Sequence, residues 1–491
     1  MSGVSLLAYA DRLCDSGRAV GDLTTLRKLL AGELSVLTGV HVLPFYTPYD
    51  GDDAGFDPVD HATVDPRLGT WDDVRAIAAH TEVTADIIVN HVSAHSAEFV
   101  DWLERGEASA HDGMFLTFDT VFPHGATEAD ITAFYRPRPG VPFTPYRARD
   151  GRRRLVWTTF MPSQVDIDVR HRAGIAYLEG LADTLAAGGV TTVRLDAVGY
   201  AVKTPGTDSF MTPDTLAFVA QAAEIIRARG LRVLVEVHAH YSQQLAIAPL
   251  VDLVYDFALP PLLLHSLGTG RTDRLAHWLG IRPANAVTVL DTHDGIGVID
   301  AGPGAGLPGL LTEEEMAAVF ARAADATGGH STLASVTPTW ASMPHQINAT
   351  FFSVLGGDTW RMLLARAVQA FVPGEPQFYY VGLLGGLDDR DRFAATGQGR
   401  EVNRHRYTRE ELDRALATPV TRGQLALAAL RRHAVFGGAF SWSQPDEASL
   451  ELVWRSAAEG GTPTHEARLL ARFDEPDFTI TLDGAEVPLD G

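Results

Sequence analysis

The sequence has little that would place this protein at a membrane, on nucleic acid or in an oxidising compartment. Cys14 is the only cysteine among 491 residues, so no disulfide can form within the chain. No run of about 18 apolar residues is present, which argues against a membrane-spanning helix. Acidic residues outnumber basic ones and give a net charge of −22, whereas nucleic acids and anionic membranes attract basic surfaces.

The first residues, MSGVSLLAYADRL, have neither the basic start nor the long apolar core of a signal peptide. We therefore expect a cytoplasmic protein with no nucleic-acid or membrane partner. An acidic protein can still act on an anionic substrate, because only a local cationic pocket has to attract it.

Apolar runs that end in polar or aromatic residues recur along the chain. Near-continuous runs of this kind are typical of parallel strands that are buried on both faces. The candidate strands lie at residues 5–10, 40–45, 85–91, 190–196, 231–238, 286–294 and 375–382.

Amphipathic helices are predicted between these strands. Within residues 172–189, for example, Ile175, Leu178, Ala182 and Leu185 share one helical face. Repeated strand–helix units with right-handed crossovers form a parallel sheet, and about eight of them close into a (β/α)8 TIM barrel.

Two long segments and the C-terminal end interrupt this alternation. Long loops inside a compact domain are usually functional, and these leave the third and seventh strands at the rim where barrel active sites lie. Short alternating strands after residue 435 predict a small C-terminal β domain. The predicted division is a catalytic barrel in three parts (1–91, 170–296 and 358–435), inserted subdomain B (92–169), a second inserted subdomain (297–357) and the β domain (436–491).

Three carboxylates follow buried strands, in VRLDAVGY, VEVHAHY and LDTHDGIG. They are Asp196, Glu236 and Asp294, and their spacing fits strands four, five and seven. Strand ends on one rim bring such groups together, which glycosidic-bond chemistry requires. Arg194, two residues before Asp196, points to the same side and should keep a nucleophilic carboxylate ionised.

Glu236 ends an apolar strand, and burial of a carboxyl group favours a proton donor near neutral pH. Asp196 could instead be part of a structural Arg–Asp pair at a strand end, and Glu236 a buried acid paired for packing. His91 could contact a sugar hydroxyl, while Asp53 and Phe56 could bind a hydroxyl and stack on a sugar face or merely form a turn. We expect no metal, because the closely spaced histidines lack a closed ligand set.

Longer stretches make a family resemblance specific. DIIVNH, RLDAVGY, VEVH and DTHD resemble the four conserved regions of the α-amylase superfamily. LLAYADRL, LPFYTPYDGDDAGFDPVDH, FYRPRPGVPFT, QVDID, YDFALPPLLLH and GREVNRHRY are similar to the sucrose phosphorylase group, glycoside hydrolase family 13. The resemblance covers roughly residues 5–435.

This resemblance implies a role for each matching residue. Asp196 matches the nucleophile, Glu236 the acid/base and Asp294 the transition-state stabiliser. The glucose-binding positions are Asp53, Phe56, His91, Arg194, His293 and Arg400. The positions around the leaving sugar and phosphate are Tyr135, Arg138, Gln164, Tyr200 and Gln346. Family members use inorganic phosphate as co-substrate without metal or organic cofactor, and many are homodimers.

The implied reaction is retaining phosphorolysis of an α-glucoside to α-glucose 1-phosphate. This chain differs from ordinary sucrose phosphorylases in the segment that ends at Gln346. Those proteins have Asp-Leu-Tyr-Gln there, whereas this chain has Met343, Pro344, His345 and Gln346. Loss of a carboxylate and gain of a possible cation favour an anionic acceptor. We therefore expect sucrose 6'-phosphate as substrate, with fructose 6-phosphate released.

Several alternatives stay open from the sequence. The substrate can be unphosphorylated sucrose or glucosylglycerate. The same carboxylates also serve a hydrolase or transglucosidase, and a non-catalytic sugar-binding protein could share the barrel.

Overall fold

A closed barrel of eight parallel strands forms the centre of the computed structural model, which describes residues 3–135, 140–304, 306–335, 344–456 and 464–489. The strands follow one another around the barrel in chain order. They are β1 (Ser5–Ala8), β2 (Gly39–Val42), β5 (Glu82–Ile88), β10 (Thr192–Asp196), β11 (Arg232–Val235), β12 (Leu253–Asp256), β13 (Ala286–Thr288) and β16 (Glu375–Tyr379). The predicted (β/α)8 TIM barrel is confirmed.

The sixth strand, β12, is absent from the strands predicted by the sequence. It has only four residues, and Asp252 interrupts the apolar run that would otherwise indicate a strand. All seven predicted strands are present. Six of the apolar runs continue beyond the end of their strand, whereas the run at residues 190–196 ends with β10.

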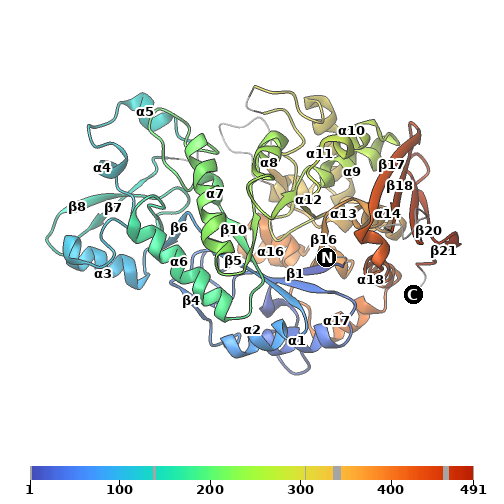
Figure 1. Ribbon diagram of the computed structural model, residues 1–491, viewed down its shortest axis with the longest axis horizontal. Coiled ribbons are helices and arrows are strands. Elements are labelled where there is room, and N and C mark those ends of the chain that lie inside the picture. Colours follow the sequence, from blue (N-terminus) through green and yellow to red (C-terminus); the bar gives the residue numbers. More distant parts are fainter. Residues whose placement is uncertain (1–2, 136–139, 305, 336–343, 457–463, 490–491) are drawn as a thin grey trace.

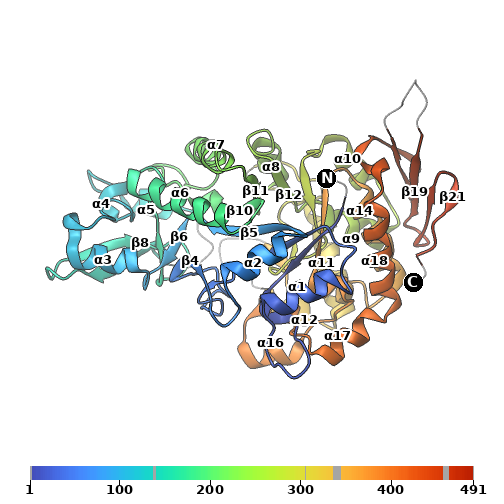
Figure 2. The same ribbon diagram turned by 60° about the horizontal axis from the view of Figure 1, so that its bottom comes forward.

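Helices surround the barrel, as Figures 1 and 2 show from two directions. Those outside the two insertions are α1 (Leu23–Ala31), α2 (Trp71–Ala78), α6 (Arg172–Ala187), α7 (Pro213–Arg227), α8 (Tyr241–Ile247), α9 (Leu259–Thr269), α10 (Asp273–Ile281), α14 (Thr359–Phe371), α15 (Tyr380–Leu383), α16 (Arg390–Thr396), α17 (Arg409–Leu416) and α18 (Pro419–Arg431). In α6, Leu178, Ala182 and Leu185 are buried as predicted, whereas Ile175 is only partly covered. Short 3-10 turns occupy Ala10–Arg12, Gly106–Ala108, Val198–Tyr200, Gly399–Asn403 and Ala434–Gly437.

The insertion after β5 forms a lobe at one side of the barrel (Figure 1). It contains β6 (His91–Ser93), α3 (Ala97–Arg105), α4 (Phe118–Val121), α5 (Glu128–Thr132), β7 (Phe143–Arg147), β8 (Arg153–Trp157) and β9 (Gln164–Asp166). β6 pairs with β9 and β7 with β8, so the lobe leaves the barrel and returns to it through neighbouring antiparallel strands. A separate strand pair, β3 (Tyr46–Thr47) with β4 (Asp60–Val64), carries the loop of Asp53 and Phe56.

The insertion after β13 is the second interruption of the barrel. It comprises β14 (Ile296–Gly297), α11 (Glu313–Thr327), α12 (His330–Ala334), β15 (Gln346–Ile347) and α13 (Phe351–Val354). β14 pairs with β15, which brings Gln346 back beside Gly297 at the barrel rim. The side chain of Thr312 caps the N-terminus of α11 by accepting a hydrogen bond from the amide of Glu315.

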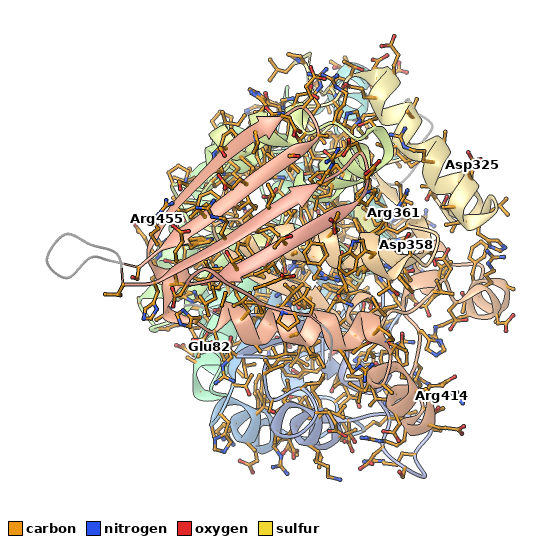
Figure 3. The ribbon with its side chains drawn as sticks, turned by 90° about the vertical axis from the view of Figure 1, so that its right-hand side faces the viewer. Glu82, Asp325, Asp358, Arg361, Arg414 and Arg455 are labelled. Atoms are coloured by element: carbon orange, nitrogen blue, oxygen red, sulfur yellow. The ribbon has the colours of Figure 1, made fainter. Side chains whose placement is uncertain are left out.

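The C-terminal strands form an antiparallel sheet in the order β17 (Ala439–Asp446), β18 (Ser449–Arg455), β19 (Glu466–Arg472), β20 (Asp477–Leu482) and β21 (Ala485–Glu486). Figure 3 faces this sheet and labels Arg455 at the end of β18. Leu450 and Leu452 are fully buried, and the indole of Trp454 donates a hydrogen bond of 2.6 Å to the carbonyl of Phe371 in α14. The predicted small β domain is therefore present and packs on the barrel's outer helices.

No helix in the described part of the chain is both long and apolar enough to cross a membrane.

Candidate active site

The three carboxylates converge at the carboxyl ends of the barrel strands. Asp196 is the last residue of β10, Glu236 directly follows β11 and Asp294 lies on the loop after β13. These are the fourth, fifth and seventh strands, as the sequence predicts. Carboxylate oxygens of Glu236 and Asp294 lie within 4.8 Å of each other, and both groups interact electrostatically with Asp196.

Arg194 holds the carboxylate of Asp196 from inside the barrel. Its Nη1 donates to Asp196 Oδ1 at 2.9 Å and also to Asp86, which confirms the predicted Arg194–Asp196 contact. Burial would raise the pKa of Asp86, but His41 and Arg194 outweigh it and lower the pKa to about 2. Arg194 is thus a fixed cation between two carboxylates on neighbouring strands.

A hydrogen-bonded chain continues from Asp86 across the barrel interior. His41 Nε2 lies 2.9 Å from Asp86 Oδ2, and His41 Nδ1 lies 3.4 Å from the hydroxyl of Tyr255. That hydroxyl donates to Gln377 Oε1 at 3.0 Å. The nucleophile position is therefore connected to five barrel strands: β2, β5, β10, β12 and β16.

The protonation of Asp196 differs from the sequence-based expectation. Burial raises its pKa well above the ordinary value; Arg194 opposes this, and Glu236 adds to it. Arg194 alone does not keep Asp196 ionised, because a second carboxylate stands beside it. An acid and a nucleophile side by side need one proton between them, and the nearby Glu236 is one cause of the raised pKa of Asp196.

Asp294 has a different electrostatic environment. Arg400 Nη1 lies 2.9 Å from Asp294 Oδ1, and Arg404 Nη2 lies 3.9 Å from the same oxygen. Burial would raise the pKa of Asp294, but Arg400, His293 and Arg404 together hold it far below the ordinary value. A permanently ionised carboxylate suits the stabilisation of positive charge at an anomeric carbon.

The predicted glucose-binding residues surround this trio. The ring of Phe56 stacks on His293 with centroids 4.8 Å apart, and the Arg194 guanidinium lies 5.6 Å from the Phe56 ring. Arg400 Nη1 lies 3.8 Å from Asp53 Oδ1. His91 Nε2 is 3.0 Å from the carbonyl of Phe56, so His91 also fixes the backbone of that loop.

Aromatic rings contact one another among the residues predicted for the acceptor side. His345 Nε2 lies 3.3 Å from the hydroxyl of Tyr135, and their rings are nearly parallel at 6.3 Å. Tyr135 also stacks on Tyr200 at 6.0 Å. Gln346 donates to Asn348 Oδ1 at 2.9 Å, and Gln164 Oε1 accepts the amide of Met161 at 3.0 Å. The remaining predicted positions, Arg138 and Met343, lie outside the described residues.

The charge expected for His345 is not supported. Burial lowers its pKa, and the nearby His238 lowers it further, against the opposing effect of Asp300. His345 is therefore a neutral ring near pH 7, which removes one of the two reasons for an anionic acceptor.

Sequence reasoning missed several residues that shape the site. Asp86 and His41 support Arg194, Arg404 supports Asp294, and His238 lies 3.5 Å from the carboxylate of Glu236. Arg404 is four residues after Arg400 in GREVNRHRY and could have been suspected, whereas the contact between His41 and Asp86 depends on barrel closure.

Glu236, His238 and Asp294 each offer one ligand atom within a common 4.8 Å. This group resembles a metal site in composition. Burial lowers the pKa of His238, but Asp300, Glu236 and Asp294 outweigh it and the net shift is upward. The three side chains therefore form a network of charged groups beside Asp300.

The barrel and its three carboxylates define an enzyme of the α-amylase type. No protein-family model matches the chain. A sucrose phosphorylase of Agrobacterium vitis is 47% identical over 98% of this chain and 97% of its own length. A sucrose phosphorylase of Bifidobacterium adolescentis is 46% identical over 95% of this chain and 92% of its own.

Among solved structures, a sucrose 6F-phosphate phosphorylase from Thermoanaerobacter thermosaccharolyticum superposes with a TM-score of 0.89. The two share 32% identity, and the match covers 99% of this chain and 98% of the other. The protein belongs to the sucrose phosphorylase group of the α-amylase family and is a glycoside phosphorylase.

Proposed function

We propose that the protein transfers the glucosyl group of sucrose to inorganic phosphate with net retention. The products are α-glucose 1-phosphate and fructose. The observation that supports the chemistry is the carboxylate pair of Asp196 and Glu236, with Arg194 on one member and the ionised Asp294 beside them.

In the first displacement, the carboxylate of Asp196 attacks the anomeric carbon. Glu236 gives its proton to the departing fructosyl oxygen, and Asp294 stabilises the positive charge that develops on the sugar. A covalent β-glucosyl enzyme results. Retaining chemistry predicts that the carboxyl groups of Asp196 and Glu236 are about 5–5.5 Å apart.

In the second displacement, a phosphate oxygen attacks the anomeric carbon from the face that fructose left. The bond to Asp196 breaks, its electron pair returns to the carboxylate, and the phosphate proton passes to Glu236. Two inversions give net retention. We propose that no metal or organic cofactor takes part, and that Asp53, Phe56, His91, His293 and Arg400 bind the glucosyl ring.

For the acceptor half of the substrate, the observations support two candidates. The neutral His345 and the two relatives above 45% identity support fructose. Sucrose 6'-phosphate is the second candidate, since His345 replaces a tyrosine of ordinary family members and can become protonated beside a bound phosphate ester. Gln164, Tyr135, Tyr200 and Gln346 are proposed to bind the acceptor, with Arg138 for phosphate.

Initial rates with sucrose, sucrose 6'-phosphate and glucosylglycerate, each with inorganic phosphate, test the proposal. We expect α-glucose 1-phosphate from sucrose at the highest kcat/KM. A higher value with sucrose 6'-phosphate would replace the acceptor. Glucose release that does not depend on phosphate would reject phosphorolysis.

We propose further that the enzyme works in the cytoplasm on small molecules alone and forms a homodimer. Light scattering of the purified protein tests the dimer.

A further inference from the structure

Asp300 lies in the insertion after β13, yet its buried side chain contacts the segment that follows β11. Oδ1 accepts hydrogen bonds from Gln244 Nε2 at 2.9 Å and from the amide of Ala239 at 3.3 Å. Oδ2 lies 3.4 Å from His238 Nδ1, and the Asp300 carbonyl accepts the amide of Tyr241 at 3.0 Å. Asp300 therefore joins two loops of the active-site rim.

His238 is the charged partner of this carboxylate within the described part of the chain. A buried carboxylate costs several kcal/mol unless it is paired, so Asp300 favours the imidazolium form of His238. The ring has little freedom, because it stacks on Phe257 at 3.9 Å and because a Cβ at Gly297 would come within 3.0 Å of its Cε1. With Nδ1 facing Asp300, Nε2 is left facing Glu236 Oε1 at 3.5 Å.

The other charged groups around His238 act on it in opposite senses. Glu236 precedes it on the loop after β11, and Asp294 faces it from the loop after β13; both favour the imidazolium. His345, from the segment before β15, would disfavour it when protonated. Burial opposes the charge, but the three carboxylates outweigh it and raise the pKa of His238 above its ordinary value.

We propose that Asp300 is a positioning residue for phosphorolysis, because it holds the His238 imidazolium with Nε2 3.5 Å from the Glu236 carboxylate. The inference rests on the proposed function. After the first displacement Glu236 is a carboxylate, and the incoming phosphate is also an anion. A cation beside Glu236 reduces the repulsion between these two anions. Attack by a neutral water molecule involves no such repulsion and should depend less on the cation.

Asp300→Asn tests this role while keeping the shape of the side chain. The variant and the wild type are compared in kcat/KM for phosphate and in hydrolysis without phosphate, both across pH 5 to 9. Loss of the negative charge lowers the pKa of His238, so the alkaline fall in phosphorolysis should move down by about one pH unit. At pH 7.5 phosphorolysis should drop about tenfold and hydrolysis less than about threefold.

Gln244→Met is the matched control, because it removes a hydrogen bond to the same carboxylate and leaves every charge in place. We expect a lower melting temperature and an unchanged pH profile. If Asp300→Asn behaves in the same way, Asp300 is only structural and the inference is wrong.

His238→Gln covers the case in which Asp300→Asn does not fold. It should lose phosphorolysis more than hydrolysis and should lack the alkaline limb assigned to His238. A wild-type profile in this variant would overturn the inference, even with phosphorolysis itself intact. A wild-type enzyme that makes no α-glucose 1-phosphate would instead reject the proposed function, and the inference with it.

Discussion

The two halves of the active site are built in different ways. On the glucose side, Asp196 and Glu236 stand at the ends of barrel strands, and buried arginines hold Asp196 and Asp294. On the acceptor side, Tyr135 and His345 come from separate insertions and meet through ring contacts. In the proposed function, the barrel positions the reacting carboxylates, whereas residues proposed for the acceptor lie on loops of the two insertions.

The contrast between the two halves would be wrong if catalysis did not depend on the carboxylates at the strand ends. Asp196→Ala should reduce turnover at least about 10³-fold with every acceptor, because no covalent intermediate can form. Steady-state rates at high protein concentration measure this, and an unchanged melting temperature shows that the fold persists. More than a few per cent of the wild-type rate would remove Asp196 from the nucleophile role.

Loss of a charge on the glucose side should affect all acceptors alike. Arg400→Ala removes the 2.9 Å contact to Asp294, and we expect kcat/KM to fall about 10²-fold. The ratio between sucrose and sucrose 6'-phosphate should stay within about twofold of the wild type. A changed ratio would show that the two halves of the site are coupled.

A change on the acceptor side should do the opposite. His345→Ala should change the ratio between sucrose and sucrose 6'-phosphate by up to about tenfold, with the phosphorylated substrate losing more. Hydrolysis of α-glucosyl fluoride, which has no acceptor sugar, should stay within about twofold. Tyr135→Phe is the control that removes the hydroxyl facing His345 and leaves the ring. Equal losses with both substrates would deny His345 any contact with a phosphate ester.

The smallest expected effect concerns the loop of Asp53. Asp57 accepts the backbone amides of Asp52 and Asp53, and burial raises the pKa of Asp57 to about 6. Because this pKa exceeds the unfolded value, the contribution to stability is complete below about pH 4 and is lost as the pH rises through 6. Over this interval the free energy of unfolding should fall by about 1–3 kcal/mol relative to Asp57→Asn. Urea titrations at pH 4, 5, 6 and 7 measure the difference; parallel curves would contradict it.

The barrel and the carboxylates could be predicted from the sequence because both depend on local pattern. Apolar runs mark buried parallel strands, and parallel strands end at one rim, so Asp196, Glu236 and Asp294 had to lie near one another. The strand β12 was not predicted, because its four residues follow an aspartate and do not form a long apolar run. The domain boundaries remain predictions, although each inserted segment contains the elements described above.

The protonation of the site could not be predicted in this way. The pKa of Asp196 depends on Glu236 from the next strand, and that of His345 depends on burial between two insertions. Asp300 and His238 lie on different rim loops, and their spacing along the chain does not predict that they are in contact. Such effects are properties of the closed barrel.

The polar chain from Gln377 through Tyr255, His41 and Asp86 to Arg194 has a consequence for assembly. β16 is the last barrel strand to be synthesised, and its Gln377 completes a line of polar groups that begins beside the nucleophile. A chain that stops before β16 would leave these groups in an apolar interior without their final partner. Truncated or half-barrel fragments of this protein should therefore be poor starting points for engineering. The polar chain that reaches Arg194 is complete only when β16 closes the barrel.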